Sequence, residues 1–269
     1  MSNEGIEALR PVGKEHAIKE VVLTLFVKQS LSQLDRFDTL CDSSLGFHEY
    51  EGLVKKIIEF KEPNDSSSEV YVKTEQPGRR IIRFHKGKPV EIIQAINEEE
   101  NDRYFISYHS LAYTRWADFK TRYFEVIAAV EAIEFNALIV AMSLHYVDEF
   151  DWKSTNLIPL KSIFMTGGVL IDDFFESQTS DFSMTLEKQQ DDVSFLDRLS
   201  IKVSPTPPGR LIRVSHNLTV KMSDPVPMRE LIGSGRTNYE YVLQVIHDYN
   251  KSTLKQLFTK PVLDLIKLS

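Results

Sequence analysis

Two long segments with helical spacing of apolar residues set the strongest limit on how this chain folds. The first covers residues 114–133, and the second runs from 237 to 258. Their apolar stripes are Trp116, Phe119, Tyr123, Val126, Ile127, Val130 and Ile133 in the first, and Val242, Val245, Ile246, Tyr249, Leu254, Leu257 and Phe258 in the second. Such stripes must be buried against another element, and a sheet with one apolar face provides the surface.

Strand patterns precede both long helices. Residues 18–28 and 138–150 are apolar on both faces, as expected of strands inside a sheet. A shorter helical segment follows each of them, at 30–45 and at 158–166. Further strand patterns lie at 53–61, 79–87, 90–96 and 103–111 before the first long helix, and at 173–187, 196–204 and 210–222 before the second.

The order strand, helix, three or four strands, long helix therefore occurs twice. It predicts an α+β fold made of two β-α-β(3-4)-α pseudo-repeats, with antiparallel sheets backed by the long helices. This order is similar to that of TATA-binding-protein-like and helix-grip folds, and the similarity by itself implies nothing about DNA binding. The predicted divisions are an N-terminal extension at 1–17, a first pseudo-repeat at 18–136 and a second at 137–269.

Charge and cysteine content exclude several classes of function. The chain has 32 Lys and Arg against 39 Asp and Glu, and its net charge of −7 opposes general attraction to nucleic acid or anionic membranes. Cys41 is the single cysteine, which excludes an internal disulfide and a cysteine-cluster metal site and suits a reducing compartment. No apolar run approaches the ~18–20 residues of a membrane span, and the N-terminus has no apolar signal region. We therefore expect a cytoplasmic protein without a membrane partner.

Three segments resemble a sporadically distributed family of uncharacterised prokaryotic proteins of about this length. They are the strand-to-helix junction with Tyr113, Trp116 and Phe119, the strand "SLHYVDEF" that contains Tyr146 and Asp148, and the tail, where a helix and "LFTKPVLDLI" follow His247. The resemblance extends from about Glu20 to the end of the chain and assigns no catalytic residue. A patchy distribution implies a mobile or defence-associated role.

Basic residues in matching strands of the two halves form one candidate site. Arg79, Arg80 and Arg83 lie in the 79–87 strand, and Arg213 lies in the 210–222 strand. If the halves join into one sheet, these arginines are predicted to line its open face and to contact RNA or DNA. The alternative is a solvated strand face with cross-strand ion pairs.

A glycine-containing loop before the second long helix forms another candidate site. Gly233, Ser234, Gly235 and Arg236 lead into the start of that helix, where free backbone N–H groups favour an anion. The loop lacks the Lys-Ser/Thr ending of a phosphate-binding loop. A tight glycine turn is therefore the structural alternative to an anion site.

Three histidines lie in predicted strands, at positions 109, 145 and 216. No pair of them has the spacing of a zinc site, and the chain contains no Gly-x-Ser-x-Gly motif of a serine hydrolase. We therefore read the histidines as structural and predict no catalytic residue, metal ligand or cofactor.

These observations favour a non-enzymatic protein that binds a protein partner or associates with itself, in a toxin–antitoxin or phage-defence setting. Two alternatives stay open. One is an RNA- or DNA-binding protein that uses the basic sheet face. The other is a ligand-binding protein or enzyme with a pocket between sheet and helices, which a cavity of ~300 Å³ or more with converging polar groups would favour.

Overall fold

The computed structural model describes residues 5–13, 16–60, 70–134 and 136–268, with only the backbone described at 56–60 and 70–74. The predicted N-terminal extension and the predicted 53–61 strand therefore fall partly outside the described residues. The strands are β1 (Leu9–Pro11), β2 (Ile18–Val27), β3 (Glu49–Phe60), β4 (Val70–His85), β5 (Lys88–Glu98), β6 (Arg103–Ser110), β7 (Leu138–Trp152), β8 (Ser180–Gln190), β9 (Val193–Thr206) and β10 (Gly209–Pro227). The helices are η1 (Leu34–Asp42), η2 (Glu99–Asn101), α1 (Trp116–Glu131), α2 (Leu160–Ile163), α3 (Asp172–Glu176), α4 (Met228–Ile232), α5 (Arg236–Leu257) and α6 (Lys260–Leu265).

The strands of the described residues form one ten-stranded antiparallel sheet. Its order is β3-β4-β5-β6-β2-β7-β10-β9-β8, and β1 adds to β7 beyond the end of β2. The central pair, β2 with β7, joins the two halves of the chain, with Leu23 opposite Leu144. The α+β class predicted from the sequence is confirmed.

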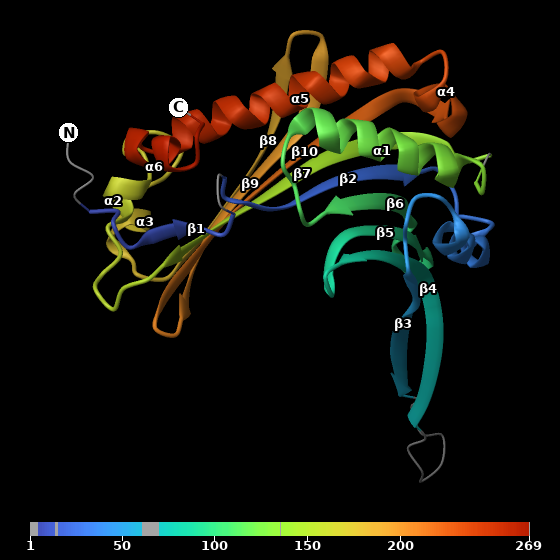
Figure 1. Cartoon of the computed structure of the whole chain (residues 1–269), viewed down its shortest axis with the longest axis horizontal. Helices are drawn as coiled ribbons and strands as arrows, with labels where there is room; N and C mark the ends of the chain where they lie inside the picture. The colour runs from blue at the N-terminus through green and yellow to red at the C-terminus, as the bar shows by residue number, and fades with distance from the viewer. Residues whose placement is uncertain (1–4, 14–15, 61–69, 135, 269) are drawn as a thin grey trace.

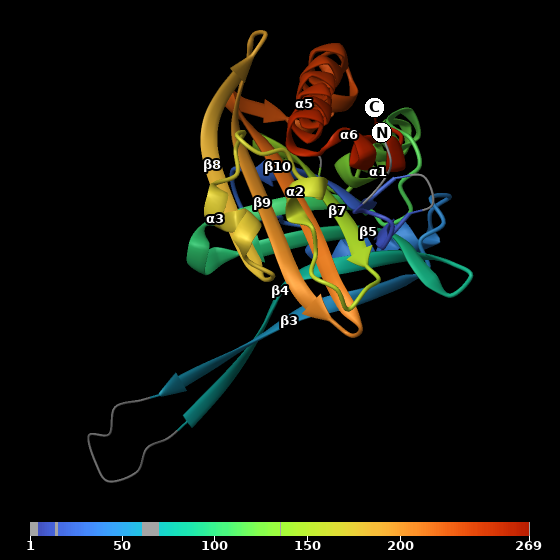
Figure 2. The ribbon, with the colours of Figure 1, turned by 90° about the vertical axis from the view of Figure 1, so that its left-hand side faces the viewer.

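The long helices α1 and α5 lie on one side of this sheet (Figures 1 and 2). We call this the helix-covered face and the opposite one the open face. The helix-covered face carries the core, because alternate residues of β2, β5, β6, β7, β9 and β10 are apolar and buried there. One core cluster contains residues of α1, α4 and the first part of α5, and a second contains residues of α2, α3, α6 and the end of α5.

The strand predicted at 173–187 is wrong in its first part. Residues Asp172–Glu176 form the short helix α3, and β8 begins only at Ser180. Asp172 and Asp173 in the first turn suit the positive end of a helix. Phe174 and Phe175 both bury into the second core cluster, which helical geometry allows and strand alternation would prevent.

The β3–β4 hairpin extends away from the rest of the sheet as a two-stranded arm (Figures 1 and 2). Near its base, the arm packs against η1. Phe37 and Leu40 of η1 are buried in the first core cluster. Within the described residues, no helix has both the length and the apolar character needed to cross a lipid bilayer.

Candidate functional site

A cavity of about 380 Å³ lies between α1 and the β4–β6 part of the helix-covered face. Arginines, tyrosines, hydroxyl groups and carboxylates make up most of its wall. The lining residues are Leu45, Arg83, Glu91, Tyr108, Ser110, Ala112, Tyr113, Thr114, Asp118, Phe119 and Arg122. We call this the α1 cavity. Its volume lies within the range of small-molecule pockets, and it is open to solvent on one side.

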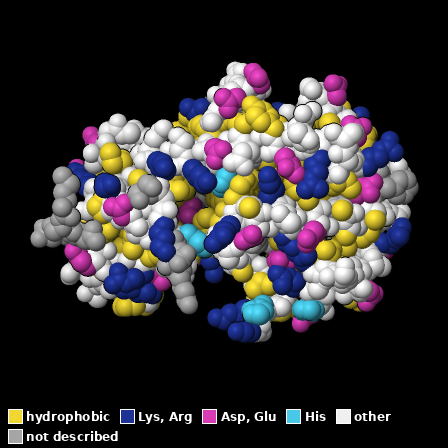
Figure 3. Space-filling model, turned by 45° about the horizontal axis from the view of Figure 1, so that its top comes forward, with side chains coloured by type: hydrophobic (Ala, Val, Ile, Leu, Met, Phe, Trp, Pro, Cys, Tyr) yellow, Lys and Arg dark blue, Asp and Glu magenta, His cyan; other side chains and the backbone are white. Residues whose placement is uncertain are grey.

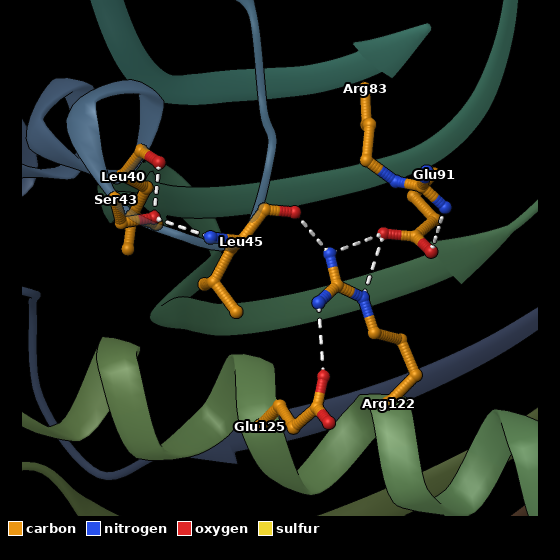
Figure 4. Close-up of polar contacts among 7 residues, drawn as sticks. All are labelled: Leu40, Ser43, Leu45, Arg83, Glu91, Arg122 and Glu125. Atoms are coloured by element: carbon orange, nitrogen blue, oxygen red, sulfur yellow. Dashed lines mark hydrogen bonds and ion pairs between the residues drawn. The ribbon is translucent and has the colours of Figure 1, made fainter. Parts of the chain in front are cut away.

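Glu91 is the centre of the polar wall. Its side chain, from β5, lies between two guanidinium groups and accepts hydrogen bonds from both (Figure 4). Arg122 of α1 donates from Nε and Nη2 to Oε2 over 3.1 and 3.0 Å, and Arg83 of β4 donates from Nη2 to Oε1. Burial alone would raise the pKa of Glu91, but the bonds from Arg83 and Arg122 outweigh it and the pKa lies below its ordinary value. Glu91 is therefore a carboxylate.

The two arginines differ in the number of hydrogen-bond partners that they have. Arg122 also donates to the carbonyl oxygen of Leu45 and, over 3.0 Å, to Oε2 of Glu125, so all three of its nitrogen atoms are used (Figure 4). Arg83 donates a hydrogen bond to Glu91, and its Nε is buried without a hydrogen-bond partner among the described residues. A buried donor without a partner costs about 1–3 kcal/mol. Arg83 therefore has fewer hydrogen-bond partners in this cavity than Arg122.

The rest of the cavity wall is aromatic and hydroxylic. Tyr108 is buried, and burial raises the pKa of its hydroxyl far above the ordinary value. The ring centres of Tyr113 and Phe119 lie 6.2 Å apart. At the rim, Thr114 donates a 3.2 Å hydrogen bond to Asp118. The site therefore combines a fixed cation with flat apolar surfaces.

The structure brings together the segments on which the family resemblance rests. Trp116 stacks on Phe119 with ring centres 5.6 Å apart and on His247 with ring centres 4.2 Å apart. The rings of Tyr113 and Tyr146 pack edge to face, with ring centres 6.5 Å apart. Residues far apart in the sequence thus form one aromatic cluster between the sheet, α1 and α5, and Tyr113 belongs both to this cluster and to the α1 cavity.

Asp148 is buried beside this aromatic cluster. Burial raises the pKa of its carboxyl to about 7, and Oδ2 has no hydrogen-bond partner among the described residues. The Asp148 charge in turn contributes to the raised pKa of Tyr113, after the larger effect of burial. A carboxyl group with this pKa is mostly protonated below about pH 7.

The four arginines of the predicted nucleic-acid surface do not share a face. Arg79 and Arg83 alternate with Arg80 along β4, so they lie on the helix-covered face with Ile81, whereas Arg80 lies on the open face. Arg213 of β10 is also on the open face. The expectation that all four line the open face is therefore wrong for Arg79 and Arg83, because successive side chains of a strand point to opposite sides.

Each of these arginines has an acidic partner. Besides the bond between Arg83 and Glu91, Arg79 pairs with Asp35 and Asp38 of η1, Arg80 Nη1 lies 2.6 Å from Oε1 of Glu51, and Arg213 donates to Oε1 of Glu149 over 2.8 and 2.6 Å. On the surface shown in Figure 3, basic and acidic side chains are likewise interspersed. These pairs reduce the positive electrostatic potential that would attract the phosphates of a nucleic acid. Nucleic-acid contact at these arginines stays a prediction.

The loop predicted to bind an anion forms a tight turn. A Cβ at Gly233 or Gly235 would lie 2.9 Å from a carbonyl oxygen of α4, so both positions require glycine. Arg236 donates from Nε to Glu240 over 2.7 Å, and its guanidinium lies 4.3 Å from the ring centre of Phe124. Thus the charge of Arg236 is already balanced within α5, and anion binding by this loop stays a prediction.

His109 is part of a hydrogen-bonded chain on the open face. Its Nδ1 lies 2.7 Å from Oε1 of Glu20, and its Nε2 lies 2.9 Å from Oγ of Ser107. This is the atom order of a serine–histidine–carboxylate relay. However, Ser107 is only 2% exposed, and β6 uses its backbone in ladders with β2 and β5, which leaves no free N–H group for an oxyanion.

The other two histidines have separate environments. His145, also on the open face, has Nε2 2.6 Å from Oγ of Ser215. His216 lies on the helix-covered face, with its ring nitrogens 2.9 Å from Asp197 and 2.7 Å from Asn250. Among the side chains that the structure describes, no three His, Cys, Asp or Glu are placed to hold a metal ion together.

Glu91 and Arg122 are residues that the sequence analysis did not single out. The sequence does contain a signal for Glu91, because alternation in β5 puts it on the same face as the buried Ile93 and Ala95. Arg122 lies beside the apolar stripe of α1, three residues after Phe119. A charge in register with buried residues indicates a partner, but the sequence does not say which.

Comparisons with known proteins leave the family open. A scan against protein-family models and a search of curated proteins find no match. Among solved structures, the chain is similar to the di-domain ARO/CYC StfQ from the steffimycin biosynthetic pathway, with 13% identity over 87% of this chain and 96% of that one. The TM-score is 0.19. A likeness this weak carries no argument about fold or function.

Proposed function

We propose that this protein binds a small aromatic carboxylate in the α1 cavity, with Arg83 holding the acidic group. The observation that carries the proposal is the guanidinium side chain of Arg83, which is 31% exposed and lies in the wall of a cavity of about 380 Å³. Guanidinium groups pair with carboxylates through parallel N–H donors, so the guanidinium of Arg83 matches this ligand class.

The arrangement supports binding because it is already organised. Glu91 fixes the Arg83 guanidinium from one side, and Arg122 fixes Glu91 from the other. A ligand therefore meets a cation whose side-chain entropy has already been lost, which favours affinity. The rings of Tyr113 and Phe119 offer flat surfaces for an aromatic body.

The experiment compares two probes and two variants by isothermal titration calorimetry. Benzoate carries the charge, and benzamide has the same shape without it. Benzoate is expected to bind the wild-type protein and Arg80→Met, and to lose at least about tenfold in affinity to Arg83→Met, since charged hydrogen bonds contribute about 1.5–3 kcal/mol. Arg80 is the matched control because it lies on the same strand but on the opposite face.

Equal affinities for benzoate and benzamide would contradict the role of Arg83. Native mass spectrometry of the protein purified from its own cells adds a readout that does not depend on the choice of probe. A co-purified organic acid that disappears in Arg83→Met supports the proposal, and one retained in Arg83→Met contradicts it.

Binding of a protein partner or self-association is kept as a second proposal. Four exposed apolar side chains support it, all within residues 157–171 around α2: Leu157, Met165, Val169 and Ile171. Leu157 is 74% exposed and Ile171 61%. Clustered exposed apolar residues are typical of interaction surfaces. A pull-down with wild-type protein and with a Leu157→Ser, Ile171→Ser variant tests it, and the same proteins recovered with both contradict it.

The pseudo-repeat and the defence setting also stay proposals. In each half the first long strand pairs with the last one, β2 with β6 and β7 with β10, and a long helix ends the half. This shared order supports two β-α-β(3-4)-α units with boundaries near 18–136 and 137–269. The toxin–antitoxin or phage-defence role rests on the family resemblance alone, and the genes on either side are the observation that tests it.

A further inference from the structure

A second cavity, of about 240 Å³, lies on the helix-covered face between β10, α4 and the start of α5. It shares no lining residue with the α1 cavity. Its wall is apolar and includes Met142, Val220, Met222, Val226, Leu231 and Val242. We call it the α5 cavity.

The irregular course of β10 explains why this space exists. The register between β10 and β7 shifts between Lys221 and Val226, so Met222 lies in a stretch that is not paired with β7. The far side is held by α4 and α5, which are joined by the tight turn at Gly233 and Gly235. Strand and helices are therefore both fixed, and the space between them is built into the fold.

Polar groups occur only at the mouth of the α5 cavity. Glu230 and Asn238, which are both exposed, lie at its rim with Gly235. Tyr239 also contributes to the wall, but its hydroxyl is hydrogen-bonded to the hydroxyl of Tyr123 over 2.7 Å. Water against an apolar wall makes fewer hydrogen bonds than in bulk, so an apolar ligand group that displaces it gains affinity.

We propose that the α5 cavity binds a small apolar molecule with one hydrogen-bond donor. The apolar body lies among Met142, Val220 and Met222, and the donor faces the oxygen atoms of Glu230 and Asn238. Apolar cavities of about 150 Å³ already accept a benzene ring, so this larger one has room for a bicyclic ring such as indole. Methionine side chains adapt to irregular apolar ligands.

The full-length protein, labelled with ¹³C in the methionine methyl groups, provides the test. The chain has six methionines. On titration with indole, the methyl signals of Met142 and Met222 are expected to shift and to saturate. Those of Met165, which is exposed, and Met184, which is packed against the second core cluster, are expected to stay in place.

Two variants localise the effect. Val242→Phe places a larger side chain in the α5 cavity, and the indole-induced shifts are expected to be lost. Tyr241→Phe is the matched control, because Tyr241 is exposed on the same helix and does not line the cavity. If Val242→Phe fails to fold, Met222→Phe fills the cavity from the strand side, with Met142 as the reporter.

Several results would overturn the proposal. They are the absence of saturable shifts at Met142 and Met222 up to the solubility of indole, unchanged shifts in the filled variants, or equal shifts at Met165. Benzothiophene, which has the shape of indole without the N–H group, tests the donor. Weaker binding of benzothiophene by several-fold supports the polar mouth, and equal binding overturns the assignment of a donor-bearing ligand.

Discussion

The hydroxyl oxygen of Tyr146 lies 2.6 Å from Nδ1 of His247, and this hydrogen bond joins the central strand β7 to α5. Burial lowers the pKa of His247 to about 3, so the imidazole is neutral at neutral pH. Trp116 of α1 stacks on the same imidazole. These contacts therefore join both long helices to the middle of the sheet. Protonation of the His247 imidazole is expected to affect the stability of the whole fold.

We expect His247 to make the protein more stable as the pH rises from about 3 to 6.5. In this range the unfolded chain binds a proton that the folded chain excludes, so the free energy of unfolding increases with pH. The increase is at most on the order of 5 kcal/mol. Urea unfolding of wild type and His247→Phe at several pH values measures it. A constant difference between the two proteins across this range would show that His247 does not titrate as described.

Asp148 is expected to have the opposite effect, a decrease in the free energy of unfolding as the pH rises. Its folded-state pKa of about 7 lies above the ordinary 3.8, so between these values the folded chain holds a proton that the unfolded chain has released. Stability is then lost as the pH rises toward 7. Asp148→Asn should exceed the wild type by on the order of 4 kcal/mol at pH 8 and match it near pH 3.

Thermal and urea unfolding of Asp148→Asn and wild type at pH 3, 5, 7 and 8 test this expectation. Asp264→Asn, at an exposed position of α6, is the matched control and should leave the pH profile unchanged. If Asp148→Asn and wild type have parallel profiles, Asp148 has the same pKa in the folded and the unfolded chain.

Removal of the Glu91 carboxylate should destabilise the fold strongly. Glu91→Ala leaves Arg83 and Arg122 without their shared partner in a largely buried position, and breaking such a pair costs about 3–5 kcal/mol. Glu51→Ala removes the carboxylate paired with the more exposed Arg80 and should cost less than about 1 kcal/mol. Equal losses in urea unfolding would mean that the Glu91 pairs are no stronger than a surface pair.

His216 and His109 form carboxylate pairs of very different burial. His216→Leu leaves the buried Asp197 with Tyr249 as its remaining side-chain partner and should cost about 3–5 kcal/mol. His109→Leu separates the partly exposed pair with Glu20 and should cost roughly 1 kcal/mol. Calorimetric unfolding measures both. A larger loss for His109→Leu would reverse the order that burial predicts.

Local patterns predicted the elements well. The stripe from Trp116 to Ile133 corresponds to α1, and the stripe that was predicted to begin at 237 corresponds to α5 at Arg236–Leu257. Thr237 and Glu240 have the Thr-x-x-Glu spacing of a capping box, but no side-chain cap forms at this helix start. Gly235 takes the N-cap position, and Glu240 pairs with Arg236 instead. A shift of two residues in the N-cap, from Thr237 to Gly235, is enough to change the capping partners.

The candidate site was predictable only in part. Arg83 was singled out as a basic strand residue, but its role was assigned to the open face. Its place beside Glu91 depends on the β4–β5 register, and the place of Arg122 depends on how α1 docks. Neither is a local property of the chain.

By itself, the sequence determined the α+β class, the two long helices and most strand positions, because apolar periodicity is set by the geometry of each element alone. Tertiary structure decided which strands pair, which side of the sheet carries each arginine, and that Tyr113, Trp116, Tyr146 and His247 meet. Those relations depend on packing between segments far apart in the chain, where side-chain shape and charge across the sheet select one register and one docking position.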